Sequence, residues 1–143
     1  MAVRSPYYSE AVEAELTEAG IDPGAFRKGQ RLYELYCMNC HKAPNNANEP
    51  EPSQRLAPPA FAVADHYRKG FPDTLERIAA IKNFTANPSV EDALMPGAVR
   101  RFGLMARMPL PEDQLEAVSI FLGTAEFVEP AWYQGHYVEE HGN

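Results

Sequence analysis

The sequence predicts an all-α protein. Apolar side chains recur at helical spacing in several segments, these segments are bounded by residues that typically start or end helices, and no segment shows the alternation of a strand. The segments that we expect to be helical span residues 9–19, 22–37, 73–83 and 111–123. The chain has 143 residues, the length of one domain, and its 13 prolines predict long irregular connections.

The first segment has the pattern of a short amphipathic helix. Ser9 can cap its start, and Gly20 can end it. Between them, Val12, Leu16 and Ala19 form an apolar stripe, while glutamates form a solvated opposite face. We expect an acidic extension, either docked or loose, that takes no part in chemistry.

The second segment carries clearer start signals. Asp22 can act as N-cap, with Pro23 at the first helical position. Phe26, Gly29 and Tyr33 share one face of this helix. Because a glycine inside a helix costs about 1 kcal/mol relative to alanine, Gly29 predicts the close approach of another helix.

The second helix leads into the motif that identifies a cofactor. Residues 37–41 read Cys-Met-Asn-Cys-His, the CxxCH pattern that attaches haem c. We expect Cys37 and Cys40 to form thioether bonds to the porphyrin, and His41 to supply one axial ligand to the iron. Residues three and four apart lie on one side of a helical turn, so this spacing brings the three side chains to one ligand.

Other interpretations of the two cysteines are weaker. A disulfide between them would close a short loop and stabilise little. A thioredoxin-like redox pair requires a βαβ context, whereas the preceding residues predict a helix. A structural zinc site needs four ligands, and this chain offers two cysteines and four scattered histidines.

The rest of the chain alternates irregular and helical segments. Residues 43–52 are polar and proline-rich, which predicts an irregular loop. Asp73 can cap the next helix, and residues 89–94 have the length of one short turn. Pro111 opens the last helix and Gly123 ends it. The C-terminal tail is rich in aromatic residues but shows no periodicity.

Charge is spread unevenly over the chain. The net charge is −7, yet basic side chains outnumber acidic ones between residues 21 and 107. The overall sign disfavours binding to nucleic acid. No stretch approaches the ~20 apolar residues of a membrane span, and the N-terminus lacks the apolar region of a signal peptide. Because haem is normally attached outside the bacterial cytoplasm, we expect a periplasmic protein whose leader is absent from this chain.

Taken together, the order of these features resembles a class I cytochrome c. The resemblance implies three main helices around one covalently attached haem, with extensions at both ends. It divides the chain into residues 1–21, an acidic helical extension, 22–124, the cytochrome c domain, and 125–143, an aromatic and acidic tail. In this family the first and last helices cross at a glycine beside aromatic rings, and Gly29, Tyr33 and Phe121 fit those roles.

The resemblance also implies a partner for the proximal histidine. In the family this histidine donates its second ring N–H to a proline carbonyl in the following loop, which fixes the ring and strengthens the ligand. Pro59 matches that position best, and Pro58 is the alternative. Both are candidates for the bond to His41.

The family places its methionine ligand before the last helix. Met105 leaves enough chain before that helix to reach the iron, and it ends a Phe-Gly-x-Met step found in a bacterial subgroup. Met108 carries the following proline that is typical of family ligands but lies closer to the helix. We expect Met105 to be the sixth ligand, with Met108 as the alternative. His66 would instead give a bis-histidine haem of lower potential.

Six-coordinate iron leaves no open site, so the resemblance implies one-electron transfer rather than catalysis. We expect a soluble monomer, not an enzyme, that docks redox partner proteins over the exposed haem edge. A basic ring could steer an acidic partner, and its members would be Arg27, Lys28, Lys42, Arg100, Arg101 and Arg107. Two alternatives stay open: a haem-bearing electron-transfer subunit of a larger dehydrogenase or oxidase, and an enzyme or gas sensor with a vacant sixth site.

Overall fold

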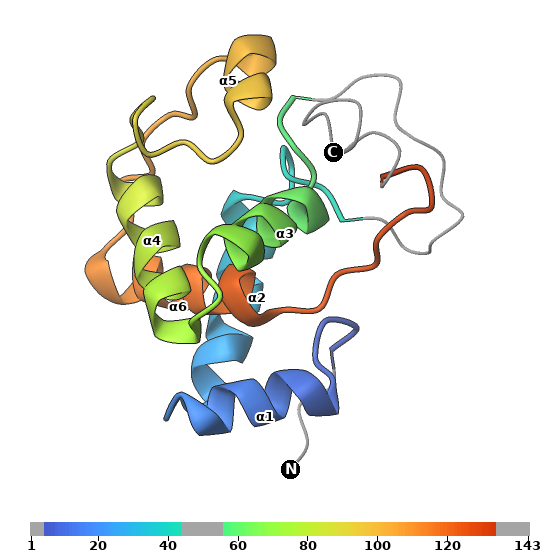
Figure 1. Ribbon diagram of the computed structural model, residues 1–143. Coiled ribbons are helices and arrows are strands. Elements are labelled where there is room, and N and C mark those ends of the chain that lie inside the picture. The colour runs from blue at the N-terminus through green and yellow to red at the C-terminus, as the bar shows by residue number, and fades with distance from the viewer. Residues whose placement is uncertain (1–4, 44–55, 134–143) are drawn as a thin grey trace.

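The computed structural model describes residues 5–43 and 56–133, and within them it has six α-helices and no strand. The helices are α1 (Glu10–Glu18), α2 (Pro23–Tyr36), α3 (Ala60–Gly70), α4 (Thr74–Ala86), α5 (Pro96–Phe102) and α6 (Glu112–Thr124). The prediction of an all-α protein is confirmed for this part of the chain. Helices α2 and α6 cross in the middle, α1 lies below them and α5 above (Figure 1). No described helix has the length and apolar character needed to cross a membrane.

The α2–α6 crossing is the centre of the core. A Cβ atom added to Gly29 would lie 2.0 Å from the carbonyl oxygen of Ala117, so the two backbones are in direct contact there. The predicted close approach of another helix at Gly29 is therefore confirmed. Beside this contact, the Phe121 ring lies 5.2 Å from that of Phe26 and 5.3 Å from that of Tyr33, measured between centroids. These three rings are nearly inaccessible to solvent.

Helix α1 is docked on the domain. The Ser9 hydroxyl accepts a hydrogen bond from the Val12 N–H at 3.3 Å, as an N-cap should, and Gly20 has a left-handed φ of +74°. Val12 and Leu16 are buried in the core. The expectation of a uniformly solvated glutamate face is wrong for Glu15, which forms polar contacts with α3 and α4.

Two helices were not expected from the sequence. Helix α3 begins directly after Pro59, and its first residues form an unbroken apolar run that hides the helical period. Helix α5 has only seven residues and starts at Pro96, inside the segment assigned to the methionine-bearing loop. The short turn expected in residues 89–94 is present as a turn at residues 90–92.

The last helix does not end at Gly123. It continues to Thr124, and Gly123 lies inside it, buried against α4. A Cβ atom added there would lie 3.2 Å from Ile78 Cγ1 and 3.3 Å from Ile81 Cδ1. This glycine therefore permits close packing of α4 on α6, a role that its position near a helix end concealed.

The described part of the tail folds back onto the domain. The Glu126 N–H donates to the Tyr7 carbonyl at 3.0 Å, and the Phe127 ring packs 5.7 Å from that of Phe121. Further along, the buried Tyr133 ring packs edge-on against Phe61, with 4.8 Å between centroids. The aromatic side chains between positions 126 and 133 thus extend the core.

Candidate functional site

The CxxCH segment forms one turn at the end of α2. The Cys37 N–H donates to the Tyr33 carbonyl at 2.8 Å, which continues the hydrogen-bond pattern of the helix. The Cys37 carbonyl then accepts from the N–H groups of Cys40 at 3.1 Å and His41 at 2.8 Å. An i to i+4 bond across the motif means that Cys37, Cys40 and His41 emerge on one side of the turn. The CxxCH spacing predicted a turn of this kind.

Both cysteines are free thiols in this turn. Cys40 is exposed and Cys37 is half-buried. Burial, and to a smaller degree the neighbouring Cys40, raises the pKa of the Cys37 thiol to about 11. A redox-active CxxC pair needs a cysteine whose pKa is lowered, and residues 5–43 and 56–133 form helices and no strand, without the βαβ context of such a pair. The raised pKa of Cys37 is therefore the opposite of what an activated dithiol requires.

The His41 ring is oriented by a backbone carbonyl. Its Nδ1 lies 2.7 Å from the carbonyl oxygen of Pro58. Because this oxygen can only accept, Nδ1 carries the proton and Nε2 holds the lone pair that a metal requires. Burial lowers the pKa of His41, against the opposing effect of the bond to Pro58, so the neutral ring is favoured.

The expectation that Pro59 accepts this bond is corrected: the partner is Pro58, the alternative. The reason is the unexpected helix α3. Pro59 is its N-cap, and its carbonyl accepts from the N–H groups of Ala62 at 3.1 Å and Val63 at 3.2 Å. That oxygen is committed to the first turn of α3, whereas the Pro58 carbonyl precedes the helix and reaches His41.

Two further hydrogen bonds fix the backbone of the motif. The Tyr33 hydroxyl donates to the His41 carbonyl at 3.1 Å, and the Ala60 N–H donates to the Lys42 carbonyl at 2.8 Å. The Tyr33 bond connects the motif to α2, and the Ala60 bond connects it to the start of α3. Sequence reasoning identified Tyr33 as a core aromatic and gave it no polar role, because a tyrosine and a phenylalanine fit the same helical pattern.

The candidate sixth ligands lie in the segment between α5 and α6. Met105 and Met108 are both half-buried. The Met108 N–H donates to the Thr85 carbonyl at 3.2 Å, which attaches its backbone to the end of α4. Met95 is the N-cap of α5 and packs against the cluster of Phe61 and Tyr133. Met105 and Met108 therefore both stay candidates for the sixth ligand.

His66, the third candidate, lies in α3. It is 8% exposed, and its Nδ1 lies 2.7 Å from the carbonyl of Ala62, one turn earlier. His66 is thus a buried histidine whose ring is hydrogen-bonded within its own helix. His136 and His141 lie outside the described residues. Within the described part, no group of three or more His, Cys, Asp or Glu side chains is placed to hold a metal ion.

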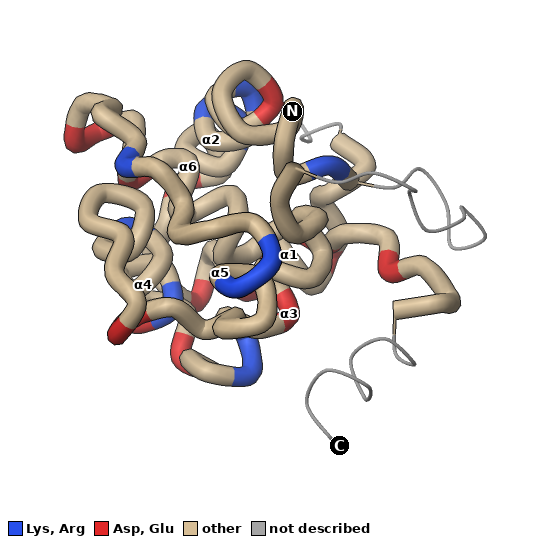
Figure 2. Tube along the Cα trace, turned by 90° about the horizontal axis from the view of Figure 1, so that it is seen from above, with Lys and Arg blue, Asp and Glu red and all other residues tan. Residues whose placement is uncertain are grey.

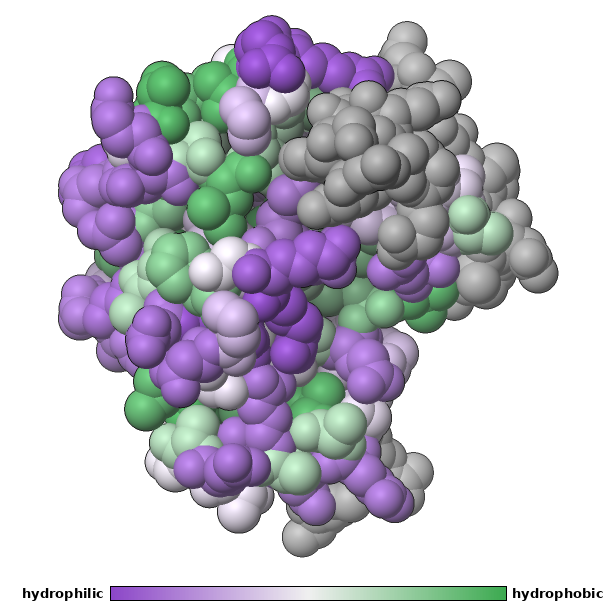
Figure 3. All heavy atoms as spheres, viewed as in Figure 1, coloured by the Kyte–Doolittle hydropathy of each residue, from purple (hydrophilic) through white to green (hydrophobic). Residues whose placement is uncertain are grey.

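The residues of the predicted basic ring differ in their contacts with the rest of the protein. Arg100 and Arg101 are exposed. They lie in the last turn of α5, where the tube carries the colour of basic residues (Figure 2). Hydrophilic side chains are spread over the whole face seen in Figure 3. Lys28 instead forms an ion pair with Asp113 at 2.8 Å. Arg107 donates from Nε to the Ala86 carbonyl at 3.1 Å. Lys28 is thus partly neutralised by α6, and α5 carries the clearest basic surface.

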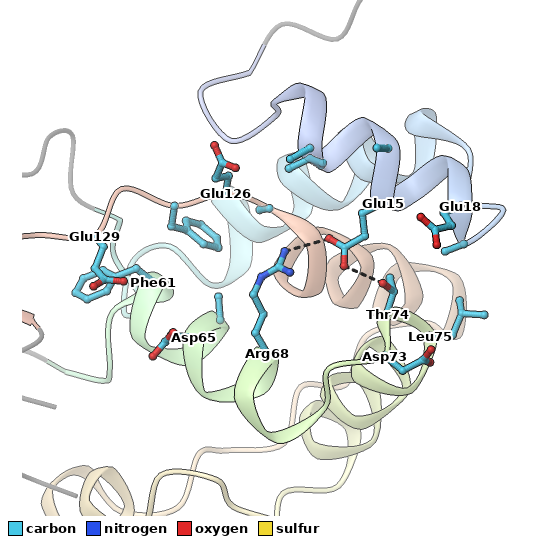
Figure 4. Close-up of a pocket in the computed structure, with 17 residues that line it drawn as sticks. Glu15, Glu18, Phe61, Asp65, Arg68, Asp73, Thr74, Leu75, Glu126 and Glu129 are labelled. Atoms are coloured by element: carbon cyan, nitrogen blue, oxygen red, sulfur yellow. Dashed lines mark hydrogen bonds and ion pairs between the residues drawn. The ribbon is translucent and has the colours of Figure 1, made fainter. Parts of the chain in front are cut away.

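A groove of about 780 Å³ lies elsewhere, between α1, α3 and residues 125–129. None of the residues predicted for the site lines it. Glu15 reaches across it to Arg68 and Thr74 (Figure 4), at 3.1 Å and 2.8 Å. These polar groups satisfy one another, so the groove is a junction between helices rather than part of the candidate site.

A comparison with known proteins identifies a relative of this chain. The chain is 31% identical over 115 residues to an uncharacterised protein of Aquifex aeolicus (strain VF5), an alignment that covers 71% of this chain and 76% of that protein. The chain therefore belongs to the same family as that protein. No family model matches the chain. No solved structure matches it either.

Proposed function

We propose that this chain is a class I monohaem cytochrome c that carries single electrons between redox proteins. The observation that carries the proposal is the bond from His41 Nδ1 to the Pro58 carbonyl at 2.7 Å, next to two free thiols on the same turn. This bond leaves Nε2 as the only ring nitrogen able to bind a metal. A histidine held in this way, one residue after a CxxC turn, fits covalent haem better than a dithiol or a zinc site.

Each of the proposed site residues would bind a different part of the cofactor. Cys37 and Cys40 would form the two thioether bonds, His41 would bind the iron through Nε2, and Met105 would supply the sixth ligand. When bound, haem iron supplies a one-electron couple between Fe(III) and Fe(II). The protein's part is to fill both axial positions, fix the histidine ring and limit contact with water, all of which set the potential.

The packing of the chain supports the class I fold in particular. The helix that precedes the motif crosses the last helix at Gly29, and aromatic rings from both helices pack beside the contact. The crossing joins segments at opposite ends of the proposed cytochrome domain. Such a crossing fits the resemblance drawn from the motif and the order of helices.

The proposed setting follows from the cofactor. Attachment of haem c outside the cytoplasm makes the periplasm the expected location. We expect a monomer that exchanges electrons with partner proteins at the exposed haem edge, with the basic surface of α5 as a candidate for steering an acidic partner.

The test is to produce the chain together with a bacterial haem-attachment system and to record its spectra. We expect haem that resists acid–acetone extraction, a low-spin spectrum in both redox states, and the weak far-red band of methionine bound to ferric iron. A matched Cys37→Ser/Cys40→Ser variant should hold no covalent haem. Wild-type protein that acquires no haem would overturn the proposal, and a high-spin spectrum would favour an enzyme or gas sensor instead.

A further inference from the structure

Tyr33 contacts both ends of the CxxCH turn. Its carbonyl accepts from the N–H groups of Cys37 at 2.8 Å and Met38 at 2.9 Å, while its hydroxyl donates to the His41 carbonyl at 3.1 Å. The residue is only 2% exposed, so the hydroxyl depends on a protein partner. Burial also raises the pKa of this hydroxyl well above its ordinary value, so it remains a donor.

His41 is consequently held at two points by two different elements. The Pro58 carbonyl, just before α3, fixes the ring, and the Tyr33 hydroxyl, on α2, fixes the backbone from which the ring extends. The Tyr33 ring in turn packs on Phe121 of α6. The position of the histidine is thereby coupled to the α2–α6 crossing.

Packing alone does not require a tyrosine at this position. A phenylalanine would make the same ring contact with Phe121, but it would leave the His41 carbonyl without the hydroxyl donor. A partly buried acceptor that loses its donor is costly, so the carbonyl would move toward another partner and carry the histidine with it. The hydroxyl therefore has a role that the aromatic ring does not explain.

We propose that Tyr33 is a positioning residue for the iron ligand, with its hydroxyl holding the His41 backbone so that the ring keeps one orientation. This inference rests on the proposed function, because it concerns His41 as a ligand of haem iron. It adds a residue outside the motif to the group that sets the ligand geometry.

The experiment compares Tyr33→Phe with Tyr7→Phe in the haem-loaded protein. The Tyr7 ring packs on the same Phe121, with 5.5 Å between centroids, so the control also removes one hydroxyl from this aromatic cluster. Two properties are measured: the electron paramagnetic resonance g-values of the ferric haem, which report the ligand orientation, and the rate at which the low-spin spectrum is lost after a jump to acidic pH.

We expect Tyr33→Phe to shift the g-values and to lose its low-spin spectrum about fivefold faster, as the loss of one neutral hydrogen bond suggests. Tyr7→Phe should match the wild type in both. Equal behaviour of the two variants would overturn the inference while leaving the proposed function intact. Absence of covalent haem in the wild type would overturn both.

A second measurement does not depend on the variant folding. In the reduced wild-type protein, the Tyr33 hydroxyl proton should exchange slowly with water and show a nuclear Overhauser contact to the His41 backbone. A hydroxyl proton that exchanges within the dead time of the experiment would contradict the bond.

Discussion

The Arg77 guanidinium of α4 forms an ion pair with Glu15 of α1, a residue 62 positions earlier in the chain. Arg77 is 1% exposed and is one of the largest fully buried side chains. Its other donors reach the carbonyls of Gly123 at 2.7 Å and of Phe71 and Pro72 at 3.1 Å each. One buried cation thus joins α1, α4, the end of α6 and the loop before α4, and it makes the N-terminal helix part of the folded domain.

Removal of the Glu15 charge should destabilise the protein by about 2 kcal/mol. Loss of one partner of a buried pair leaves the other charge uncompensated, and the 20% exposure of the Glu15 side chain reduces that cost below the value for a fully buried pair. Glu15→Gln is compared with Glu18→Gln on the same helix, where Glu18 is exposed. The measurement is the free energy of unfolding in denaturant. Equal values for the two variants would contradict the role assigned to Arg77.

The same contact predicts a dependence of stability on pH. Burial raises the pKa of Glu15, but hydrogen bonds from Thr74 and Arg68 and the charges of Arg68 and Arg77 together outweigh it and lower the pKa below the ordinary 4.5. The stabilisation is therefore complete above the ordinary pKa and is lost as pH falls through the lowered value. Unfolding is measured from neutral pH to about 3. The difference in free energy of unfolding between the wild type and Glu15→Gln should become smaller as the pH falls. A constant difference would show that the charge of Glu15 is not the cause.

Gly29→Ala should be strongly destabilising, by about 3 kcal/mol or more. The added methyl group would lie 2.0 Å from the Ala117 carbonyl, and a backbone atom within a packed helix cannot move aside cheaply. Gly70→Ala is the matched control, because its methyl group meets only the Leu94 side chain at 3.3 Å. Thermal unfolding followed by circular dichroism should show a large drop for the first variant alone. A small drop in the unfolding temperature of Gly29→Ala would mean that α2 and α6 separate more easily than this contact implies.

Local sequence signals predicted those parts of the fold that local physics determines. The caps at Ser9 and Asp73 each accept a backbone N–H, as expected of N-cap residues, and the cost of a glycine inside a helix correctly predicted the crossing at Gly29. Gly123 shows the limit of the same reasoning. A glycine near a helix end and a glycine inside a helix contact look alike in sequence, and only the position of Ile78 distinguishes them.

The candidate site also combines features that the local sequence predicts with features that depend on tertiary contacts. The CxxCH spacing predicted the turn that joins Cys37 to His41. The choice between Pro58 and Pro59 depended on where α3 begins, and an unbroken apolar run after two prolines does not reveal that boundary. The polar role of Tyr33 depends on a tertiary contact, so no periodicity could have predicted it.

Single substitutions should distinguish the candidate sixth ligands in the haem-loaded protein. We expect Met105→Ala to lose the far-red band, to become high-spin and to bind added carbon monoxide in the reduced state, because a vacant axial position accepts small ligands. Met108→Ala is the control and should keep the band, since the Met108 backbone is attached to Thr85 whichever side chain it carries. The reverse result would assign Met108 as the ligand. Retention of the band in both variants would show that neither methionine is the sixth ligand.

If the proposed function holds, the basic surface of α5 should control the rate at which charged reagents exchange electrons with the haem-loaded protein. Arg100 and Arg101 are exposed and adjacent, so Arg100→Glu/Arg101→Glu reverses a local field without disturbing buried contacts. Oxidation of the reduced protein by the anion ferricyanide should slow by about threefold at low ionic strength, and the difference should vanish in high salt, where the field is screened.

A cationic cobalt complex provides the internal control for that experiment. Its rate should rise in the same variant, because the sign of the local charge has been reversed and the reagent has changed from repelled to attracted. Equal slowing of both reagents would instead indicate a change in the haem site itself. Unchanged rates for both would mean that electrons leave the protein at a face remote from α5, and the steering role would then pass to the other exposed cations near the motif, Arg27 and Lys42.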